Sequence, residues 1–213
     1  MNTLFIERST ADGSLALAKD GIVFAAKKLD GAGVNGGAWA REVREFLGAQ
    51  SIERIVVGTG PGSFAGIRAA LAFAQGYAIG SGCRVEGLPS PCAFAPAEGP
   101  LAVVGDARRG MYWIALFDGP RLVCDIFQAD AEKLHLRVPV GVKVVTPDAA
   151  RIDALLKETF GSDYAGGETP EARDLAKAAY ANPSLLVSEP LPVYLNPAVR
   201  HVNKLRLIFL LSL

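Results

Sequence analysis

The chain has 213 residues, half of them apolar and 21% charged, which is enough to form one domain or two small ones with a buried core. Its 22 basic residues are balanced by 22 acidic ones. A protein that binds nucleic acid by itself normally carries a basic excess, because contacts to phosphates supply most of the affinity. The balance therefore predicts that any association with nucleic acid is indirect.

The cysteines and the two ends of the chain indicate a cytoplasmic protein without a membrane anchor. Three scattered cysteines have neither the spacing of a disulfide framework nor that of a zinc site: Cys83, Cys92 and Cys124. Charged Glu7 and Arg8 interrupt the first apolar stretch, which is therefore no signal peptide. The late apolar run 207–211 is too short to span a bilayer.

The first hundred residues begin with three closely spaced strands. Short apolar segments at 3–6, 14–17 and 22–26 are separated by turn-forming residues. Strands this close in sequence must be antiparallel, because a parallel crossover needs about a dozen residues. A glycine-rich link at 31–37 then leads to a helix at about 38–48, whose apolar residues recur at helical spacing.

A strand, a helix and a second strand follow, and then the pattern starts again. The predicted elements are a buried strand at 54–58, a helix at 64–79, a strand at 83–87 and a short helix at 90–96. Beyond a proline-rich boundary at 96–100 come a strand at 101–105, a hairpin of strands 111–117 and 122–127, a strand at 142–145 and helices at 148–159 and 170–181.

This order predicts two α/β lobes, residues 1–97 and 98–213, each a mixed sheet flanked by helices. The pattern is that of the two-lobed actin-like ATPase fold, also called the ASKHA or ribonuclease H-like fold. The amino-terminal lobe would hold the partner-binding helices, and the carboxy-terminal lobe would be partly degenerate.

The stretch Gly58–Arg68 places a glycine turn between a strand and a helix, where backbone N–H groups can receive an anion. A Walker P-loop is excluded because no Lys follows the glycines. The spacing of Gly60, Gly62 and Ala65 fits a dinucleotide-binding GxGxxA motif, with Glu86 about twenty residues on. The third interpretation is a tight turn whose glycines give backbone freedom and whose Ser63 caps the helix.

The helix after this turn is apolar all round and rich in small residues, so we expect it to be covered on more than one face. One face would lie on the sheet: Ile67, Leu71, Gln75 and Ala78. The other would be covered either by the helix at 38–48 or by a second protein chain: Ala70, Phe73, Gly76 and Tyr77.

Four segments resemble the TsaB family. The sequence GPGSFAGIR at 60–68 resembles the family signature GPGSFTGxR, with Ala65 in place of Thr. Leu4–Thr10 resembles the opening LAIDTST, but Glu7 and Arg8 replace Asp and Thr. Asp106–Gly110 resembles the DARxG turn, which could equally be a solvated hairpin connection. The segment 192–197 resembles the closing PxYLRP stretch, with Asn196 in place of Arg.

The resemblance implies a non-catalytic subunit of the tRNA-modifying complex that makes threonylcarbamoyladenosine (t6A) at adenosine 37. Such a subunit docks on TsaD, forms a homodimer when TsaD is absent, and meets tRNA only through the complex. ATP and metal would belong to the partners TsaD and TsaE, while TsaC makes the threonylcarbamoyl-adenylate. The implied site residues are the signature turn (Gly60, Pro61, Gly62, Ser63, Phe64, Gly66, Arg68), the partner interface (Ala70, Phe73, Gly76, Tyr77) and the second-lobe turn (Asp106, Arg108, Arg109).

No catalytic or metal-binding residues stand out in the sequence. The two histidines, His135 and His201, are far apart, whereas TsaD carries an HxxxH metal pair. The cysteines are interpreted as small buried hydrophobes. The alternative functions are a stand-alone actin-fold, kinase-like ATPase and a Rossmann-type NAD(P)-binding protein. The sequence gives no role for the apolar segment 201–213.

Overall fold

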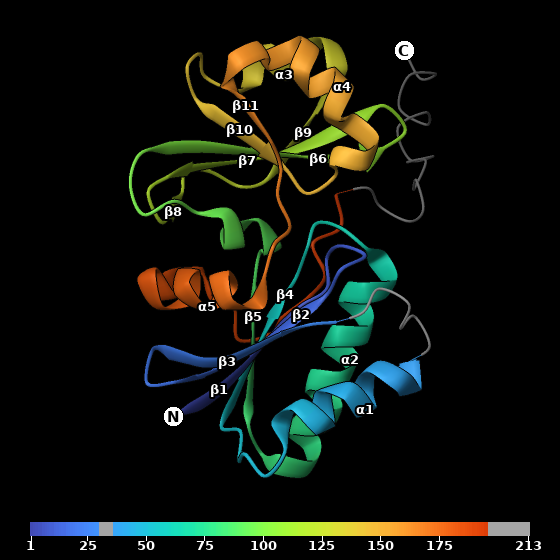
Figure 1. Ribbon diagram of the computed structural model, residues 1–213, viewed down its shortest axis with the longest axis vertical. Coiled ribbons are helices and arrows are strands. Elements are labelled where there is room, and N and C mark those ends of the chain that lie inside the picture. Colours follow the sequence, from blue (N-terminus) through green and yellow to red (C-terminus); the bar gives the residue numbers. More distant parts are fainter. Residues whose placement is uncertain (30–35, 196–213) are drawn as a thin grey trace, which may run out of the picture.

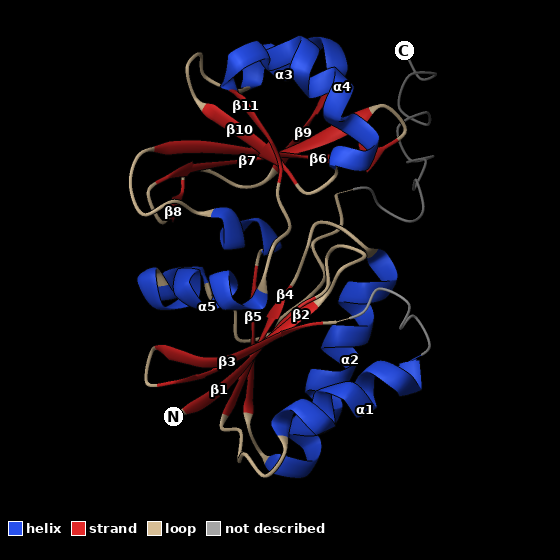
Figure 2. Cartoon of the chain, in the orientation of Figure 1, coloured by secondary structure: helices blue, strands red, loops and turns tan. Residues whose placement is uncertain are grey.

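The computed structural model describes residues 1–29 and 36–195, which form two stacked α/β lobes (Figure 1). The predicted link at 31–37 therefore lies outside the described residues except for its last two positions, and so do Asn196 and the segment 201–213. Colouring by secondary structure shows a sheet in each lobe with helices packed against it (Figure 2). The predicted two-lobed α/β architecture with mixed sheets is confirmed.

The first lobe contains a five-stranded sheet in the order β3-β2-β1-β4-β5. Its strands are β1 (Asn2–Glu7), β2 (Ser14–Lys19), β3 (Ile22–Lys28), β4 (Arg54–Gly58) and β5 (Arg84–Leu88). β1, β2 and β3 pair antiparallel as predicted, and β4 and β5 run parallel to β1. A Rossmann domain would open with parallel strands, so the antiparallel β1–β2–β3 meander contradicts the dinucleotide-binding alternative.

Helices cover both faces of the first sheet. The helices α1 (Gly36–Leu47) and α2 (Phe64–Ser81) lie on one face, and α5 (Ala172–Ala181) lies on the other with the 3-10 helix η1 (Ser90–Phe94) (Figure 1). β1 supplies both cores because successive strand residues point to opposite faces. Leu4 and Ile6 join the cluster under α1 and α2, whereas Phe5 joins the cluster under α5.

The second lobe contains a six-stranded sheet. Its strands are β6 (Pro100–Arg108), β7 (Met111–Asp118), β8 (Arg121–Leu122), β9 (Phe127–Asp130), β10 (Lys143–Thr146) and β11 (Tyr164–Gly167). The order is β11-β10-β6-β7-β8, and β9 also pairs with β7. The helices α3 (Leu134–Arg137) and α4 (Ala149–Phe160) cover its outer face, and short 3-10 turns lie at Ala131–Lys133, Gly161–Asp163 and Pro183–Leu185.

The predicted single strand at 122–127 is wrong. Pairing with β7 stops after Leu122 and resumes at Phe127. Between them, the N–H of Val123 still donates to the carbonyl oxygen of Leu116 at 2.8 Å, but Cys124 and Asp125 are exposed and outside the strand pairing. The sequence analysis also missed β11 and α3, which are four residues long each and too short to show a period.

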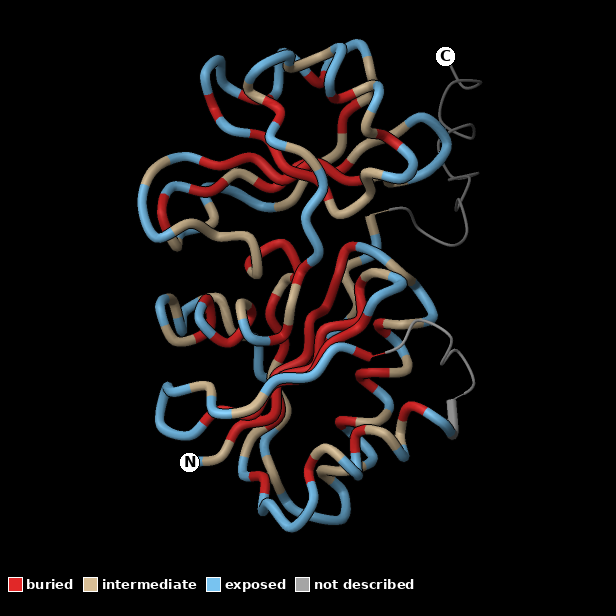
Figure 3. The backbone as a smooth tube through the Cα atoms, viewed as in Figure 1, coloured by how far each residue is buried: buried red, intermediate tan, exposed pale blue. Residues whose placement is uncertain are grey.

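One hydrophobic cluster spans both lobes. It joins Phe5 and Val56 of the first sheet to Trp113 and Phe117 of the second through Leu175 of α5 and its neighbours. Figure 3 shows the buried backbone continuing along the inner strands of both sheets. The expected boundary at 97/98 falls between η1 and β6 and stays a prediction. The helix α5 follows the second sheet in sequence but packs on the first sheet, so the chain returns to the first lobe after forming the second.

The described residues contain neither a membrane-spanning helix nor a group of side chains that could hold a metal ion. Within 1–29 and 36–195, no helix is both long and apolar enough to cross a bilayer. Over the same ranges, no group of three or more His, Cys, Asp or Glu side chains is arranged to hold a metal ion.

Candidate functional site

The signature turn connects β4 to α2 at the carboxyl end of the parallel strands. Gly60–Pro61 is a cis peptide, and Gly60 and Gly62 have positive φ angles of 89° and 156°. The hydroxyl oxygen of Ser63 accepts the N–H of Gly66 at 3.3 Å, so Ser63 is the N-cap of α2 as the sequence predicted. Phe64 and Arg68 follow on the exposed surface, where the guanidinium of Arg68 lies 4.9 Å from the Phe64 ring centre.

The turn between β1 and β2 presses directly onto this signature turn. The Ser63 N–H donates to the carbonyl oxygen of Ser9 at 2.6 Å. A Cβ at Gly62 would lie 2.2 Å from that same oxygen, and a Cβ at Gly66 would lie 2.2 Å from the carbonyl oxygen of Arg8. The two glycines are therefore required because backbone from β1 occupies the space that a side chain would need.

Glu7, the last residue of β1, is completely buried beneath the turn. One carboxyl oxygen accepts the N–H of Ser9 at 2.6 Å, while the other, Oε2, has no hydrogen-bond partner. A Cβ at Gly58 would lie 1.9 Å from Oε2, so the carboxyl group fills the space over β4. Burial raises the pKa of Glu7, and hydrogen bonds from Ser9 oppose this only in part.

Arg8 is buried on the opposite side of the sheet from Glu7. Its side chain is 9% exposed, and its guanidinium lies over the Trp39 ring of α1, 4.9 Å from the ring centre. Nε and Nη1 have no hydrogen-bond partner. Burial lowers the pKa of Arg8, and the charge of Glu42 partly offsets this effect. The Arg8 side chain therefore fills the space between β1 and α1 and does not extend toward the signature turn.

The residues of the first lobe do not fit a nucleotide phosphate at this turn. Four backbone N–H groups are already used within the protein: Thr59 donates to Leu88, Gly60 to Ser90, Ser63 to Ser9 and Gly66 to Ser63. The buried Glu7 carboxyl lies directly beneath Gly58, where it would disfavour an anion. The turn is therefore closed by backbone packing, and these four donors are bonded within the fold.

The buried face of α2 differs from the sequence prediction. Ile67, Ala70, Leu71 and Ala74 are buried against the sheet, whereas Gln75 is exposed. Ala70 has no exposed surface at all, so its assignment to a partner interface is wrong. The predicted faces were rotated about the helix axis because α2 is apolar on every side, and its sequence gives little sign of which side meets the sheet.

Helix α1 covers part of the predicted interface. Trp39 of α1 packs against Phe73 with ring centres 5.1 Å apart, and Phe73 stacks on Tyr77 at 6.1 Å. Phe73 and Tyr77 are therefore half-buried within the chain, as the internal-cover interpretation expected. Gly76 is exposed.

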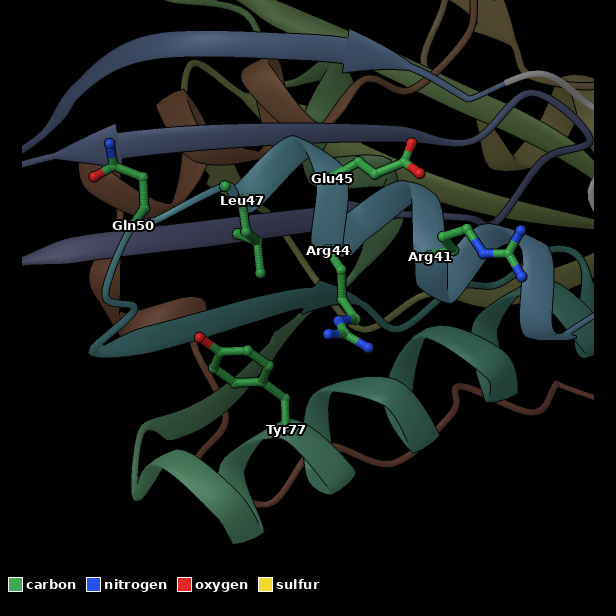
Figure 4. A pocket seen from close by; sticks show the side chains of 7 residues that line it. Arg41, Arg44, Glu45, Leu47, Gln50 and Tyr77 are labelled. Carbon is green, nitrogen blue, oxygen red and sulfur yellow. The ribbon is translucent and has the colours of Figure 1, made fainter.

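A groove of about 480 Å³ lies where α1 and α2 diverge. Figure 4 shows Tyr77 of α2 and Arg44 of α1 pointing toward each other across it. The groove is lined by Arg41, Arg44, Glu45, Leu47, Gly48, Gln50 and Tyr77. Most of these residues are charged or polar, so this groove forms a polar border beside the apolar surface of α2.

No element of the described residues covers the side of α2 that faces away from the sheet, and we call it the outer face of α2. It is formed by Ala65, Ala72, Gly76 and Ile79, which recur at helical spacing and are all exposed. Ile79 is 88% exposed. A Cβ at Gly76 would meet nothing within 4 Å, so no contact with another described residue explains a glycine there. Glycine in a helix interior costs about 1 kcal/mol relative to alanine.

The second-lobe turn is a tight hairpin that joins β6 to β7. Arg108 and Arg109 both have positive φ, 68° and 56°, and Gly110 follows at 74°. The Asp106 carboxylate accepts the N–H of Arg108 at 2.7 Å and the Nε–H of Arg151 at 2.7 Å. Asp106 is therefore bonded into the protein, whereas Arg108 and Arg109 lie on the exposed surface.

The sequence analysis missed that Asp148 and Arg151 of the α4 region complete this cluster. Asp148 accepts the N–H of Asp106 at 2.8 Å and also binds Arg151. Burial raises the pKa of Asp148, although Arg151 and the Asp106 N–H oppose the shift. The i, i+3 spacing of Asp148 and Arg151 could have indicated their pairing, but nothing in the sequence shows that β6 ends beside them.

The cysteines and the described histidine show no catalytic arrangement. Burial raises the pKa of Cys92 to about 12, Cys83 is half-buried and Cys124 is exposed. The expectation that all three cysteines are buried is therefore wrong for Cys124. His135 is exposed on α3, and His201 lies outside the described residues.

Comparison with protein families gives a match over more than half of the chain. Residues 45–158 match the model of the family described as TsaD: tRNA N6-adenosine threonylcarbamoyltransferase. The match starts in α1 and includes the signature turn, α2, the second-lobe turn and most of α4.

Solved structures share the fold over nearly the whole chain. YeaZ from Pseudomonas aeruginosa has a TM-score of 0.68 at 22% identity, covering 91% of this chain and 99% of that one. An uncharacterized protein from Pseudomonas aeruginosa with similarity to peptidase YeaZ has a TM-score of 0.70 at 19% identity, covering 92% and 99%. The resemblance expected from the signature motifs is confirmed in family and in fold.

Curated relatives match over a shorter stretch. Uncharacterized proteins of Mycobacterium tuberculosis and Mycobacterium bovis are 40% identical over 83 residues. The matched stretch is 38% of this chain and spans 39% of the length of these relatives.

Proposed function

Because the chain belongs to the TsaD family of tRNA N6-adenosine threonylcarbamoyltransferase proteins, we propose that it is the non-catalytic, TsaB-type subunit of a t6A-forming complex. In this role it docks on TsaD through the outer face of α2 and supports the transfer of threonylcarbamoyl to adenosine. ATP, metal and the transfer chemistry belong to TsaD and TsaE, and tRNA meets the chain through the complex.

The observation that carries this proposal is the combination of a closed turn and an open helix face. At the carboxyl ends of the strands, where an actin-like ATPase binds phosphate, Glu7 and the β1–β2 turn fill the space. Beside that turn, α2 exposes an apolar strip that runs from Ala65 to Ile79. Such a strip lets a partner helix approach closely, since Gly76 and Ala72 hold little side chain between the two backbones.

The same closed turn disfavours a stand-alone ATPase as the alternative. Such an enzyme needs free N–H donors and a carboxylate placed to hold a metal beside the phosphates. In this chain the Glu7 carboxyl group at the end of β1 is buried against Gly58, and its Oε2 has no hydrogen-bond partner among the described residues. We therefore expect no ATP turnover from the purified chain alone.

The docking role is tested by titrating the purified chain with TsaD of the same organism in a calorimeter. Ala72→Arg places a charge at the centre of the outer face of α2, and we expect it to weaken binding at least a hundredfold because the charge would be buried without a partner. Leu136→Arg is the matched control, because Leu136 is 71% exposed on α3 of the other lobe. It should bind TsaD as the unsubstituted chain does.

A reconstituted t6A assay completes the test. The chain should be required for t6A formation, and Ala72→Arg should fail to support it while Leu136→Arg succeeds. Equal affinity of Ala72→Arg and the unsubstituted chain for TsaD would show that the outer face of α2 is not the docking surface. Saturable ATP hydrolysis by the chain alone would instead support the enzyme interpretation.

A further inference from the structure

The groove between α1 and α2, which we call the α1–α2 groove, contains two arginines that no described residue neutralises. Arg41 and Arg44 lie three residues apart on α1, and both line the groove. Neither side chain forms an ion pair or a hydrogen bond with another described residue. Arg44 lies in the last turn of α1, where the helix dipole favours a cation, but this does not account for Arg41. Two like charges one helical turn apart repel each other, so their placement is mildly unfavourable in the free chain.

The acidic side chains of α1 are directed away from these arginines. Glu42 forms an ion pair with Lys27 of β3 at 2.8 Å. Glu45 also lines the groove, but Figure 4 shows its carboxylate on the opposite side of α1 from the guanidinium of Arg44. Arg44 instead points across the groove toward Tyr77 of α2 (Figure 4). The nearest carboxylates in the sequence therefore leave the two arginines available to an anion from outside the chain.

The lining of the α1–α2 groove suits carboxylate groups. A guanidinium donates two parallel N–H groups to a carboxylate, and such charged hydrogen bonds are stronger than neutral ones. The hydroxyl of Tyr77 and the amide of Gln50 add further donors on the same lining. The volume of about 480 Å³ exceeds what one small anion would fill. The groove therefore fits acidic side chains carried on a protein segment.

The α1–α2 groove borders the outer face of α2. Tyr77 lines the groove and directly follows Gly76, which belongs to the outer face. A partner helix that lies along the outer face of α2 would therefore pass beside the groove. Protein interfaces commonly surround an apolar centre with a polar rim, whose charges fix the orientation of the partner and speed its association.

We propose that the α1–α2 groove receives carboxylate side chains of the TsaD molecule that docks on the outer face of α2. This inference rests on the proposed function. Arg41 and Arg44 form ion pairs with Asp or Glu side chains of TsaD, and these pairs set the orientation in which TsaD lies on α2. Phosphates of RNA suit the groove less well, because Glu45 shares its lining and the chain has 22 acidic residues for 22 basic ones.

The ion pairs are tested by measuring the association of the full chain with TsaD of the same organism at several salt concentrations. We expect Arg41→Gln combined with Arg44→Gln to weaken binding about tenfold at low salt, mainly by slowing association, and to reduce the dependence of binding on salt. Arg41→Lys combined with Arg44→Lys keeps both charges and should retain most of the affinity. Arg137→Gln is the matched control, because Arg137 is exposed in the last turn of α3 in the other lobe. It should bind TsaD as the unsubstituted chain does.

A cross-link without a spacer tests the contact directly. The Arg44→Lys variant is mixed with TsaD and treated with a carbodiimide, which joins an amine to a carboxylate as an amide only where the two groups touch. The water lost in forming the amide converts the carbodiimide to a urea. We expect mass spectrometry to find a peptide that joins position 44 to an Asp or Glu of TsaD. The Arg137→Lys variant should give no link from position 137 to TsaD.

Failure of this inference and failure of the proposed function give different results. If the double glutamine variant binds TsaD with unchanged affinity and salt dependence while Ala72→Arg still blocks binding, the ion pairs do not form and the docking role survives. Links from position 44 that reach only the chain itself lead to the same conclusion. If the double glutamine variant binds TsaD normally but weakens the binding of tRNA to the assembled complex, the groove contacts RNA and the inference is wrong. If the unsubstituted chain does not bind TsaD, the proposed function fails and this inference fails with it.

Discussion

The two lobes place an acidic residue at the same topological position but treat it in opposite ways. In each lobe the first strand pairs antiparallel with the second and parallel with the strand before the main helix. Glu7 lies at the end of β1, fully buried and with one unpaired oxygen. Asp106 lies near the end of β6, paired with Arg151 and bonded to backbone.

The difference shows that burial, and not topology, decides what a carboxylate at this position can do. In the first lobe the β1–β2 turn packs against α2 backbone to backbone, leaving no room for solvent or ligand around Glu7. In the second lobe charged side chains join the β6–β7 hairpin to α4. Backbone packing therefore closes the space around Glu7 in the first lobe. In the second lobe ion pairs that remain partly solvated hold Asp106 in place.

The largest expected effect on stability comes from adding one methyl group where α2 packs against the β1–β2 turn. Gly66→Ala would place a Cβ 2.2 Å from the carbonyl oxygen of Arg8, and we expect a loss of stability of about 3 kcal/mol. Gly76→Ala in the same helix meets nothing and should stabilise by roughly 0.5–1 kcal/mol. Urea unfolding of both variants measures the difference. Shifts of the same sign would show that α2 is not pressed against the β1–β2 turn.

We expect an intermediate effect on stability from replacing the buried Glu7. Because the pKa of Glu7 is raised in the folded chain, the unfolded chain loses its proton first as pH rises. Glu7 therefore lowers stability progressively from its ordinary pKa of about 4.5 up to its folded value, and the loss persists above that. Glu7→Gln should match the unsubstituted chain near pH 4 and exceed it by roughly 1–2 kcal/mol at neutral pH.

Thermal unfolding from pH 4 to pH 8 measures this dependence. Asp153→Asn is a suitable control, because hydrogen bonds from Lys157 and Tyr164 lower the pKa of that exposed carboxyl. The folded chain favours the charged form of Asp153, so Asp153→Asn should lower stability at pH values above the pKa of this carboxyl in the unfolded chain. A Glu7→Gln variant less stable than the unsubstituted chain at pH 7 would mean that the carboxylate is ionised and paired.

The smallest expected effect on stability comes from breaking the ion pairs of Arg151 in the second lobe. Arg151→Ala removes the partner shared by Asp106 and Asp148, and we expect a loss of about 1 kcal/mol, since the arginine is 41% exposed and screened by solvent. Lys157→Ala in the same helix breaks only its ion pair with Asp153, and it should change stability by under about 0.5 kcal/mol. The loss for Arg151→Ala should shrink at high salt. A loss that is independent of salt would indicate packing instead of charge.

Most of the fold could be predicted because its strands and turns follow strong local signals. Short spacing in the sequence predicts the antiparallel meander β1–β2–β3, and the apolar run Ile55-Val56-Val57 after Arg54 predicts β4. The paired segment 122–127 could not be predicted correctly, since its apolar residues look like a strand and only tertiary contacts show that Cys124 and Asp125 leave the sheet.

The candidate site was predictable in location but not in detail. The signature turn and its Ser63 cap follow from glycine and serine at a strand-to-helix junction. The orientation of α2 does not follow, because Ala70 and Ala72 look alike in sequence, yet one is buried and the other exposed. The burial of Glu7 was equally hidden, since glutamate is almost never fully buried.

The position of α5 has a consequence for synthesis of the chain. The face of the first sheet that carries Phe5, Ala16 and Val56 is covered by a helix made more than eighty residues after β5. Until Ala172–Ala181 leaves the ribosome, the short 3-10 helix η1 covers only part of this apolar face. We therefore expect the amino-terminal half to mature only when translation is nearly finished, with chaperones shielding it in the interval.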